Sequence, residues 1–300
     1  MESQARGLAE AAGLSPDLRL LNPRGLWRYL SASFWPAPLC AIDRSALAPP
    51  LPDLIIGCGI KAGAVMAALS KTVCRVMVQR PVSNLSRFDL VVVGRHDQVT
   101  GPNVVVTRTA LHRVTPARLA EAAAAWGPRL AHLPRPLVAV LVGGSNGRFR
   151  LDAAVGARLA GELAGMMRRD KVGLVVTPSR RTDPAVIRVL TEMLRPLGAY
   201  VWDMQGENPY FGLLALANAI VVTGDSVSMM SEAVATSAPV LVVALPGRSH
   251  RQGLFTRGLF NEGRARPFLG RLETWPVEPL NDTPEAAAEM CRRLGIGPAG

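Results

Sequence analysis

Hydroxyl and carboxylate side chains gather where the apolar run IVVTG gives way to a helical stretch. Asp225, Ser226 and Ser228 follow the run, and Glu232 lies one helical turn beyond Ser228 on the same face. A helix that begins at Ser226 offers backbone N–H groups and the positive end of its dipole to an anion, while Glu232 could accept hydrogen bonds from a ribose diol. Alternatively, Ser226 only caps the helix and Glu232 is solvated, which is the simpler interpretation of the Ser-x-Ser pattern alone.

Two more loops with phosphate-binding groups follow apolar runs in the same half of the chain, LVAVLVGG (137–144) and VGLVVTPS (172–179). Glycine lets a backbone approach a phosphate closely, and an arginine can hold a diphosphate with two hydrogen bonds. The candidate residues of these loops are Gly143, Gly144, Ser145, Asn146, Ser179 and Arg180. A single glycine-rich turn is weak evidence, so the prediction depends on all three loops leaving one edge of one sheet.

Short apolar runs alternate with helical stretches along most of the chain, as in a parallel α/β sheet whose strands are buried on both faces. One helix is predicted over 115–127, with Thr115 as N-cap and Gly127 at its end. The stretch PRLAHLPRP (128–136) interrupts the alternation and is typical of a linker. We therefore expect two doubly wound, Rossmann-like domains facing a cleft, an N-terminal acceptor-side domain over 1–133 and a C-terminal nucleotide-binding domain over 134–300. The last helix could also pack back on the first domain.

His96 and Asp97 follow the run FDLVVVG in the N-terminal half. At the carboxyl end of a strand, either side chain could act as the base that deprotonates an acceptor hydroxyl. The alternative is a turn in which Asp97 caps the backbone. No other residue of this half is an equally good candidate for a catalytic base.

Composition narrows the classes of function. The 300 residues carry a formal net charge of +11, which suits phosphorylated small molecules or anionic lipid. Nucleic acid is not expected, because aromatic residues are only 5% of the chain and no arginine–aromatic RNA-binding motif is present. The four cysteines and four histidines are scattered, so we expect neither a metal site nor a cofactor. No signal peptide or membrane span is evident, which favours a cytoplasmic protein.

Three arginines lie among large apolar and aromatic side chains in the segment LRLLNPRGLWRYLSASFWPAP (18–38). Such a mixture suits a surface that docks on an anionic membrane, on its inner face, and receives a lipid-linked acceptor. An ordinary helix with an aromatic face turned to the core is an equally good interpretation.

Several stretches together resemble the bacterial relatives of the plant elongated-mitochondria fission proteins. They are VQRPVSNLSRFDLVVVGRHD, GPNVVVTRTALHRVTP, VLVGGSNG, TPSRRT, NPYFGLLALANAIVVTGDSVSMMSEA and RGLFNEGRARPF, and they cover roughly residues 50–270. That family looks like a GT-B glycosyltransferase fold, and its C-terminal half is similar to the lipid-linked N-acetylglucosamine transferase of peptidoglycan synthesis. The resemblance implies that Glu232 contacts the ribose of a nucleotide sugar and that Gly143, Gly144 and Ser145 form the matching glycine-serine loop.

Two departures bear on what the resemblance implies about activity. We expect the first helix of the N-terminal domain to start without the strand and glycine-rich turn that should precede it, either because the start codon is misassigned or because the protein lacks them. Arg80 also stands where an acidic residue is expected. We expect a nucleotide-sugar-binding, metal-independent glycosyltransferase-like protein that acts on a membrane-associated acceptor. The alternative is a non-catalytic scaffold that recruits a partner protein at a membrane surface. The nucleotide, sugar, acceptor, stereochemistry and oligomeric state are not indicated by the sequence.

Overall fold

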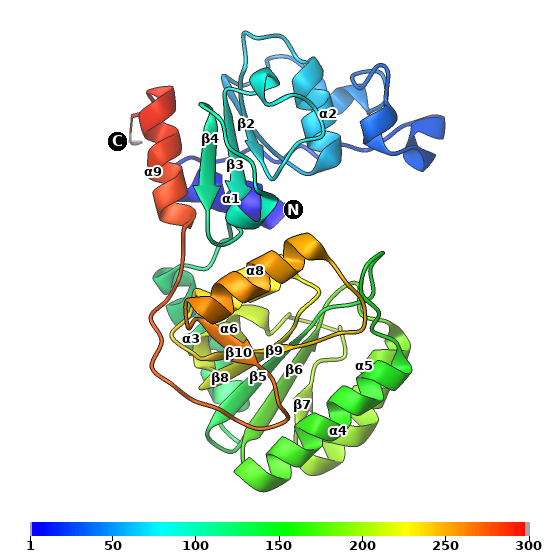
Figure 1. Cartoon of the computed structure of the whole chain (residues 1–300), viewed down its shortest axis with the longest axis vertical. Helices are drawn as coiled ribbons and strands as arrows, with labels where there is room; N and C mark the ends of the chain where they lie inside the picture. The colour runs from blue at the N-terminus through cyan, green and yellow to red at the C-terminus, as the bar shows by residue number, and fades with distance from the viewer. Residues whose placement is uncertain (1, 298–300) are drawn as a thin grey trace. The chain divides into compact units, whose positions relative to one another are not determined.

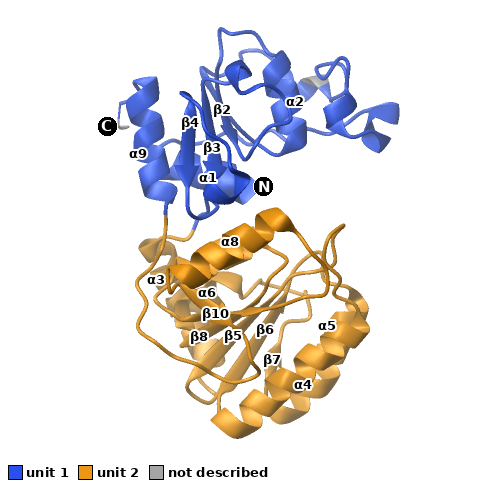
Figure 2. Cartoon of the chain, in the orientation of Figure 1, with its two compact units in different colours: residues 1–113, 282–300 blue, residues 114–281 orange. Residues whose placement is uncertain are grey.

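The computed structural model describes residues 2–297, apart from the side chain of Arg44, and divides into two compact units (Figure 1, Figure 2). Unit 1 takes the chain up to Arg113 and again from Asp282, and unit 2 takes Val114–Asn281. Each unit contains one parallel sheet with helices packed on it. The predicted fold class, two α/β units on parallel sheets, is confirmed.

Unit 1 contains a four-stranded sheet in the order β1-β2-β3-β4. Neighbouring strands are parallel and in sequence order, with register pairs such as Ile56 with Val76. The helices and strands of this unit are α1 (Glu2–Ala11), β1 (Leu54–Cys58), α2 (Ile60–Ala68), β2 (Cys74–Val78), β3 (Leu90–Gly94), β4 (Val104–Thr107) and α9 (Thr283–Leu294).

Helices cover both faces of this sheet. Leu8 of α1 and Met290 of α9 belong to the core cluster on one face, and Met66 of α2 belongs to the cluster on the other. α1 also lies against the chain after β4, where a Cβ at Gly7 would be 2.4 Å from the carbonyl oxygen of His112. Only glycine at this position lets α1 pack so closely.

The chain between α1 and β1 is mostly irregular. It forms three short 3-10 helices, η1 (Gly25–Tyr29), η2 (Ala32–Phe34) and η3 (Arg44–Leu47). Trp35 and Ile42 are buried there in a small cluster with Val65 of α2. The regular helix with an aromatic core face, one of the two interpretations of residues 18–38, is therefore wrong.

Unit 2 contains a six-stranded parallel sheet in the order β10-β9-β8-β5-β6-β7. Its helices and strands are α3 (Pro116–Leu130), β5 (Leu137–Val142), α4 (Ala153–Asp170), β6 (Gly173–Pro178), α5 (Pro184–Leu194), β7 (Tyr200–Val201), α6 (Tyr210–Leu216), β8 (Ala219–Thr223), α7 (Val227–Val234), β9 (Val240–Val243), α8 (His250–Asn261) and β10 (Ala265–Pro267).

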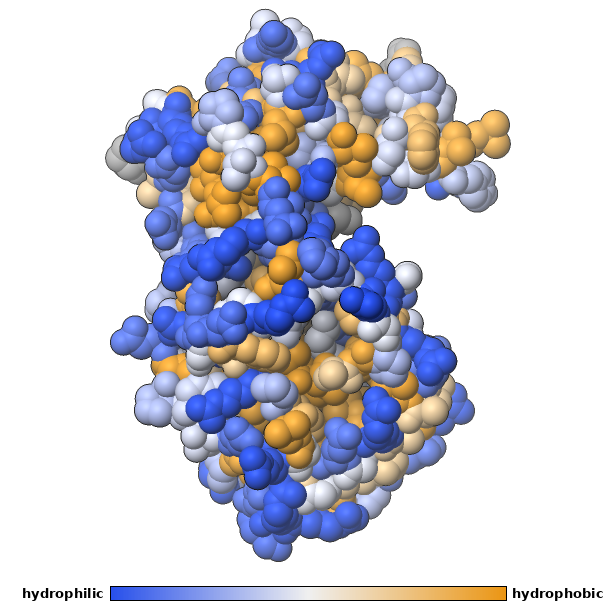
Figure 3. Space-filling model, viewed as in Figure 1, coloured by the Kyte–Doolittle hydropathy of each residue, from blue (hydrophilic) through white to orange (hydrophobic). Residues whose placement is uncertain are grey.

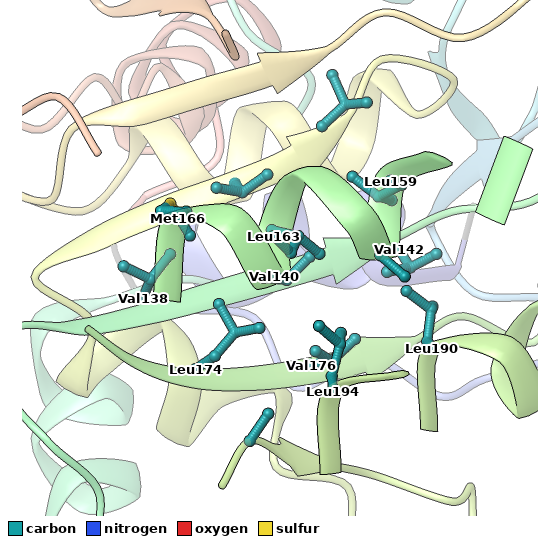
Figure 4. Packing of buried hydrophobic residues seen from close by; sticks show 14 of the residues in the cluster. Val138, Val140, Val142, Leu159, Leu163, Met166, Leu174, Val176, Leu190 and Leu194 are labelled. Atoms are coloured by element: carbon teal, nitrogen blue, oxygen red, sulfur yellow. The ribbon is translucent and has the colours of Figure 1, made fainter. Parts of the chain in front are cut away.

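The central strand β5 explains why the sequence of this unit shows continuous apolar runs. All six of its side chains are buried, because alternate residues enter core clusters on opposite faces of the sheet. On one face Val138 and Val140 pack with Leu163 of α4 and Leu174 of β6 (Figure 4). The other face is covered by α3, α6 and α7.

The boundary between the units differs from the one predicted after residue 133. α3 was assigned to the first domain, but Trp126 and Leu130 are buried in the core cluster of unit 2. A Cβ at Gly212 of α6 would lie 2.4 Å from Cγ of Trp126, so these helices are in close contact. α9 belongs to unit 1, where it packs on α1. The apolar surface on which an amphipathic helix packs decides to which unit the helix belongs. The order of elements along the chain does not show which surface that is.

α3 also ends later than predicted. Thr115 caps the helix as predicted, because its hydroxyl accepts a backbone N–H of the first turn at 3.2 Å. The helix then continues through Gly127 and Pro128 to Leu130. Glycine and proline weaken a helix, but burial of Leu130 at 0% exposure favours the last turn. The first turn of the predicted linker (128–136) is therefore helical.

Candidate functional site

The sheet of unit 2 has its topological switch point between β5 and β8. From β5 the chain adds β6 and β7 on one side, and then adds β8, β9 and β10 on the other. In open α/β sheets, ligands bind beyond the carboxyl ends of the strands at this point. Four loops end there, and we call them the rim: residues 143–152, 179–183, 224–226 and 244–249. The predicted convergence of three loops at one sheet edge is confirmed.

A buried carboxylate joins three of these loops. Asp225 accepts hydrogen bonds from the backbone N–H of Gly144 at 3.1 Å and from Nη2 of Arg181 at 3.0 Å. Its other oxygen accepts the hydroxyl of Thr223 at 2.7 Å, and that hydroxyl oxygen in turn accepts the N–H of Gly143 at 2.7 Å. The side chain of Asp225 has no exposed surface. Asp225 thus holds the loops after β5, β6 and β8 together.

Gly143 and Gly144 are needed for this contact. A Cβ at Gly143 would lie 2.1 Å from Oδ1 of Asp225, and a Cβ at Gly144 would lie 2.0 Å from the carbonyl oxygen of Arg181. Both glycine amides donate within the chain. The close approach that glycine allows here is between two loops of the protein itself, and the role of Gly143 and Gly144 in binding a diphosphate stays a prediction.

Ser145 and Asn146 shape the loop after β5. Ser145 Oγ accepts the N–H of Leu151 at 2.8 Å and donates to its carbonyl oxygen at 3.1 Å. Asn146 Oδ1 accepts the N–H of Arg148 at 2.9 Å. The loop after β9 pairs with this turn, and at Gly247, with φ of 132°, a Cβ would lie 2.0 Å from the carbonyl oxygen of Arg148. Backbone hydrogen bonds thus join the two loops into one part of the rim.

Arginine side chains project from three of the rim loops. Arg148, Arg150, Arg180 and Arg248 are all exposed. Arg150 forms a surface ion pair with Asp152 at 3.2 Å. An ion pair exposed to water contributes little to the stability of the fold. The side chains of Arg180 and Arg248 form no hydrogen bond or ion pair with any other described residue. The rim therefore carries a positive charge that the protein does not neutralise.

The loop after β6 is closed by a hydroxyl that the sequence reasoning missed. Thr182 is buried, donates to the carbonyl of Gly143 and accepts the N–H of Ser179 at 2.8 Å. Ser179 Oγ accepts the N–H of Arg181 at 3.3 Å. Ser179, a predicted phosphate-binding residue, thus helps to shape the turn that presents Arg180. A threonine three residues after a serine was the available signal, since short hydroxyl side chains close such turns.

The helix after β8 begins as predicted. Ser226 is its N-cap, with Oγ accepting the N–H of Met229 at 3.3 Å, and Ser228 is half-buried in the first turn. The carbonyl of Gly224, two residues before the N-cap, accepts a hydrogen bond from the side-chain amide of Gln252 in α8. The N-terminus of α7 is thus fixed at the rim by contacts on both sides.

Glu232 forms a hydrogen bond that the sequence did not predict. Its Oε2 accepts the hydroxyl of Tyr210, the first residue of α6. Burial and the negative charge of Glu232 raise the pKa of Tyr210 well above its usual range, so the hydroxyl stays protonated and donates. Phe211 packs edge-on against Tyr210, with Arg118 4.4 Å above its ring centre. A solvated Glu232, the simpler interpretation, is wrong.

His96 and Asp97 lie in unit 1, in the 3-10 turn that follows β3. Both are buried, with exposed fractions of 8% and 6%. Asp97 Oδ2 accepts the N–H of Gly94 at 3.3 Å and so caps the turn. A Cβ at Gly94 would lie 2.2 Å from Cε1 of His96, so the ring packs on the backbone. The capping interpretation of this pair is confirmed for Asp97.

Metal-binding and nucleophilic groups are sparse. Within residues 2–297, no three His, Cys, Asp or Glu side chains are placed to hold a metal ion together. Burial raises the pKa of the Cys58 thiol to about 11, which makes it a poor nucleophile at neutral pH.

No helix in the described part of the chain is long and apolar enough to cross a membrane.

Comparison with known families gives a match over nearly the whole chain. The family model described as "Mitochondrial fission ELM1" matches residues 1–294. The chain belongs to this family. The mitochondrial fission protein ELM1 of Arabidopsis thaliana is 34% identical over 278 residues, an alignment that covers 81% of this chain and 64% of that protein. The chain thus spans less than two thirds of the length of this curated relative.

Two solved structures show weaker similarity to this ELM1-family chain. MurG of Acinetobacter baumannii has a TM-score of 0.43 and 17% identity, over 81% of this chain and 65% of that one. A putative UDP-N-acetylglucosamine 2-epimerase of Listeria monocytogenes has a TM-score of 0.49 and 13% identity, over 95% of this chain and 76% of that one.

Proposed function

We propose that unit 2 binds the diphosphate of a nucleotide sugar at its rim, and that the protein transfers the sugar to a membrane-associated acceptor without a metal ion. The observation that carries this proposal is the set of exposed arginines at the switch point of the sheet. Arg180 and Arg248 extend from loops that hydrogen bonds hold in place. Guanidinium groups bind phosphate oxygens with fixed geometry, so a diphosphate is the ligand that suits this rim.

The positions of the rim groups along α7 support a nucleotide rather than a bare diphosphate. Ser226 and Ser228 lie at the N-terminus, where the helix dipole favours an anion. Glu232 is six residues beyond Ser226, about 9 Å along the helix axis, which is the scale of a ribose next to a diphosphate. A half-buried carboxylate at that distance can accept both hydroxyls of a ribose diol.

In the proposed reaction, an acceptor hydroxyl attacks the anomeric carbon as the bond from that carbon to the diphosphate oxygen breaks. The acceptor proton passes to a base, and negative charge develops on the leaving diphosphate. Arg180, Arg248 and the N-terminus of α7 would stabilise that charge where it forms. Because the amides of Gly143 and Gly144 already donate within the chain, the arginines and the N-terminus of α7 carry this role in place of the glycine loop.

A second function is favoured by the state of the candidate base. Asp97 is used to cap a turn and His96 is buried beside it, so neither side chain is presented to an acceptor as a catalytic base usually is. A scaffold that recruits a partner protein at a membrane surface needs no base. On this alternative, unit 2 either binds no nucleotide or binds one only to stabilise the protein.

Binding of uridine, guanosine, adenosine and cytidine diphosphates, measured by calorimetry and thermal shift, tests the proposal. We expect at least one to bind, and Arg180→Gln to weaken that binding about tenfold to a hundredfold, as for loss of a charged hydrogen bond. Arg188→Gln is the matched control, because Arg188 is an exposed arginine of α5 outside the rim. Release of nucleoside diphosphate from nucleotide sugars then tests transfer.

Two outcomes would contradict the proposal. If none of the four diphosphates binds, the scaffold is favoured. If Arg188→Gln weakens binding as much as Arg180→Gln does, the binding reflects the overall positive charge and not a site at the rim. If a nucleoside diphosphate binds but no nucleotide sugar is turned over, the binding site at the rim is supported and the proposed sugar transfer is contradicted.

A further inference from the structure

Large apolar side chains are exposed in one short part of unit 1. Twelve large hydrophobic residues are exposed in the described chain, and six of them lie between residues 18 and 34. Those with the highest exposed fractions are Leu26 at 80%, Tyr29 at 79% and Phe34 at 78%. Monomeric proteins seldom gather so many exposed apolar groups without a partner that covers them.

This exposure occurs in an ordered segment. Trp35 and Ala32 are buried against α2, and the indole N–H of Trp35 donates to the carbonyl of Leu30 at 3.3 Å. Ser31 caps the turn η2 by accepting the N–H of Ser33 at 3.4 Å. The segment projects at the right of unit 1 in Figure 1, and Figure 3 shows hydrophobic surface at its outer end. Its inner side chains are thus fixed on the unit while its outer ones face solvent.

The charge of the same segment has one sign. Arg19, Arg24 and Arg28 lie within residues 18–38, and no aspartate or glutamate lies there. Arg19 is paired with Asp17, just before the segment, at 3.0 Å. Arg28 donates to a backbone carbonyl within its own turn. The exposed apolar side chains are therefore accompanied by cationic groups that no carboxylate of the segment neutralises.

We propose that residues 18–38 dock the protein on an anionic lipid bilayer, with Leu26, Tyr29 and Phe34 entering the interface and the arginines contacting lipid phosphates. Leucine and aromatic side chains interleaved with arginine match the apolar depth and the negative surface of such a membrane. A protein partner or a second copy would have to supply acidic groups among apolar ones. This proposal is independent of nucleotide binding in unit 2.

Co-sedimentation of the whole protein with phosphatidylcholine vesicles, with and without phosphatidylglycerol, tests the proposal. We expect binding only when phosphatidylglycerol is present, weakened by salt. Leu26→Ser with Phe34→Ser, and separately Arg24→Gln with Arg28→Gln, should each lower the partition coefficient about tenfold or more. Leu269→Ser is the control, because Leu269 is 68% exposed in unit 2 and should leave binding unchanged.

The readouts separate docking from misfolding and from self-association. The exposed residues contribute little to the core, so circular dichroism and the melting temperature should not change in either double variant. The proposal is overturned if the double variants bind like the parent, or if phosphatidylcholine alone binds equally well. It is also overturned if the protein ignores vesicles but forms a dimer that Leu26→Ser disrupts, since the patch would then join two copies.

Discussion

Replacing Asp225 with alanine is expected to destabilise unit 2 strongly. The substitution removes the acceptor of the Gly144 N–H and of the Thr223 hydroxyl, both buried, at a cost of about 1–3 kcal/mol for each buried donor left without a partner. Arg181 also loses its partner, but its side chain is 46% exposed, so water replaces much of that interaction. We therefore expect a loss of about 3 kcal/mol in the free energy of unfolding.

For a unit of this size, about 3 kcal/mol corresponds to a fall of roughly 6–12 °C in the melting temperature. Differential scanning calorimetry measures the fall, and hydrogen exchange locates it at the amides of β5 and β8. Arg181→Gln is the reference variant, because it keeps the carboxylate and its two buried donors and should cost about 1 kcal/mol or less. The reasoning is refuted if Asp225→Ala is no more destabilising than Arg181→Gln, since Asp225 would then not hold the rim.

Three further expectations follow from particular contacts. Tyr210→Phe should weaken nucleoside diphosphate binding up to about tenfold in calorimetry, because Glu232 loses the donor that orients it. Burial lowers the pKa of His112 from 6.5 to about 4. The unfolded chain therefore takes up the proton first as the pH falls, and stability present above pH 6.5 should be lost between 6.5 and 4, by roughly 3 kcal/mol in pH-dependent denaturation. Gly212→Ala should lower the melting temperature, because the new methyl group would clash with Trp126.

Local physical chemistry was enough to predict most strands and several helix starts. Runs such as 137–142 and 219–223 are apolar without interruption because both faces of a parallel strand are covered, so their sequence alone marks them. Thr115 and Ser226 were identifiable as N-caps, since a short oxygen-bearing side chain satisfies a backbone N–H within its own turn. These features depend on neighbours in sequence.

The assignment of helices to units could not be predicted in the same way. α3 follows β4 in sequence, yet it packs on α6 through Trp126 and Gly212. α9 is the last helix of the chain, yet Asp282 at its start accepts the backbone N–H and guanidinium of Arg108 in unit 1. The apolar face of a helix shows that the helix is buried against something, and only the tertiary structure shows against what.

The same distinction between sequence and tertiary structure applies to the candidate site. The sequence by itself determined that Gly143, Asp225 and Glu232 would lie at the carboxyl edge of one sheet. Strands that alternate with helices along the chain run parallel, so the loops after them leave the same edge of the sheet. The tertiary structure decided what each of them does. Asp225 accepts a hydrogen bond from the backbone N–H of Gly144, and Glu232 accepts one from the hydroxyl of Tyr210. The residue type determines which functional group a side chain carries. Its hydrogen-bond partner depends on distances between residues that only tertiary packing determines.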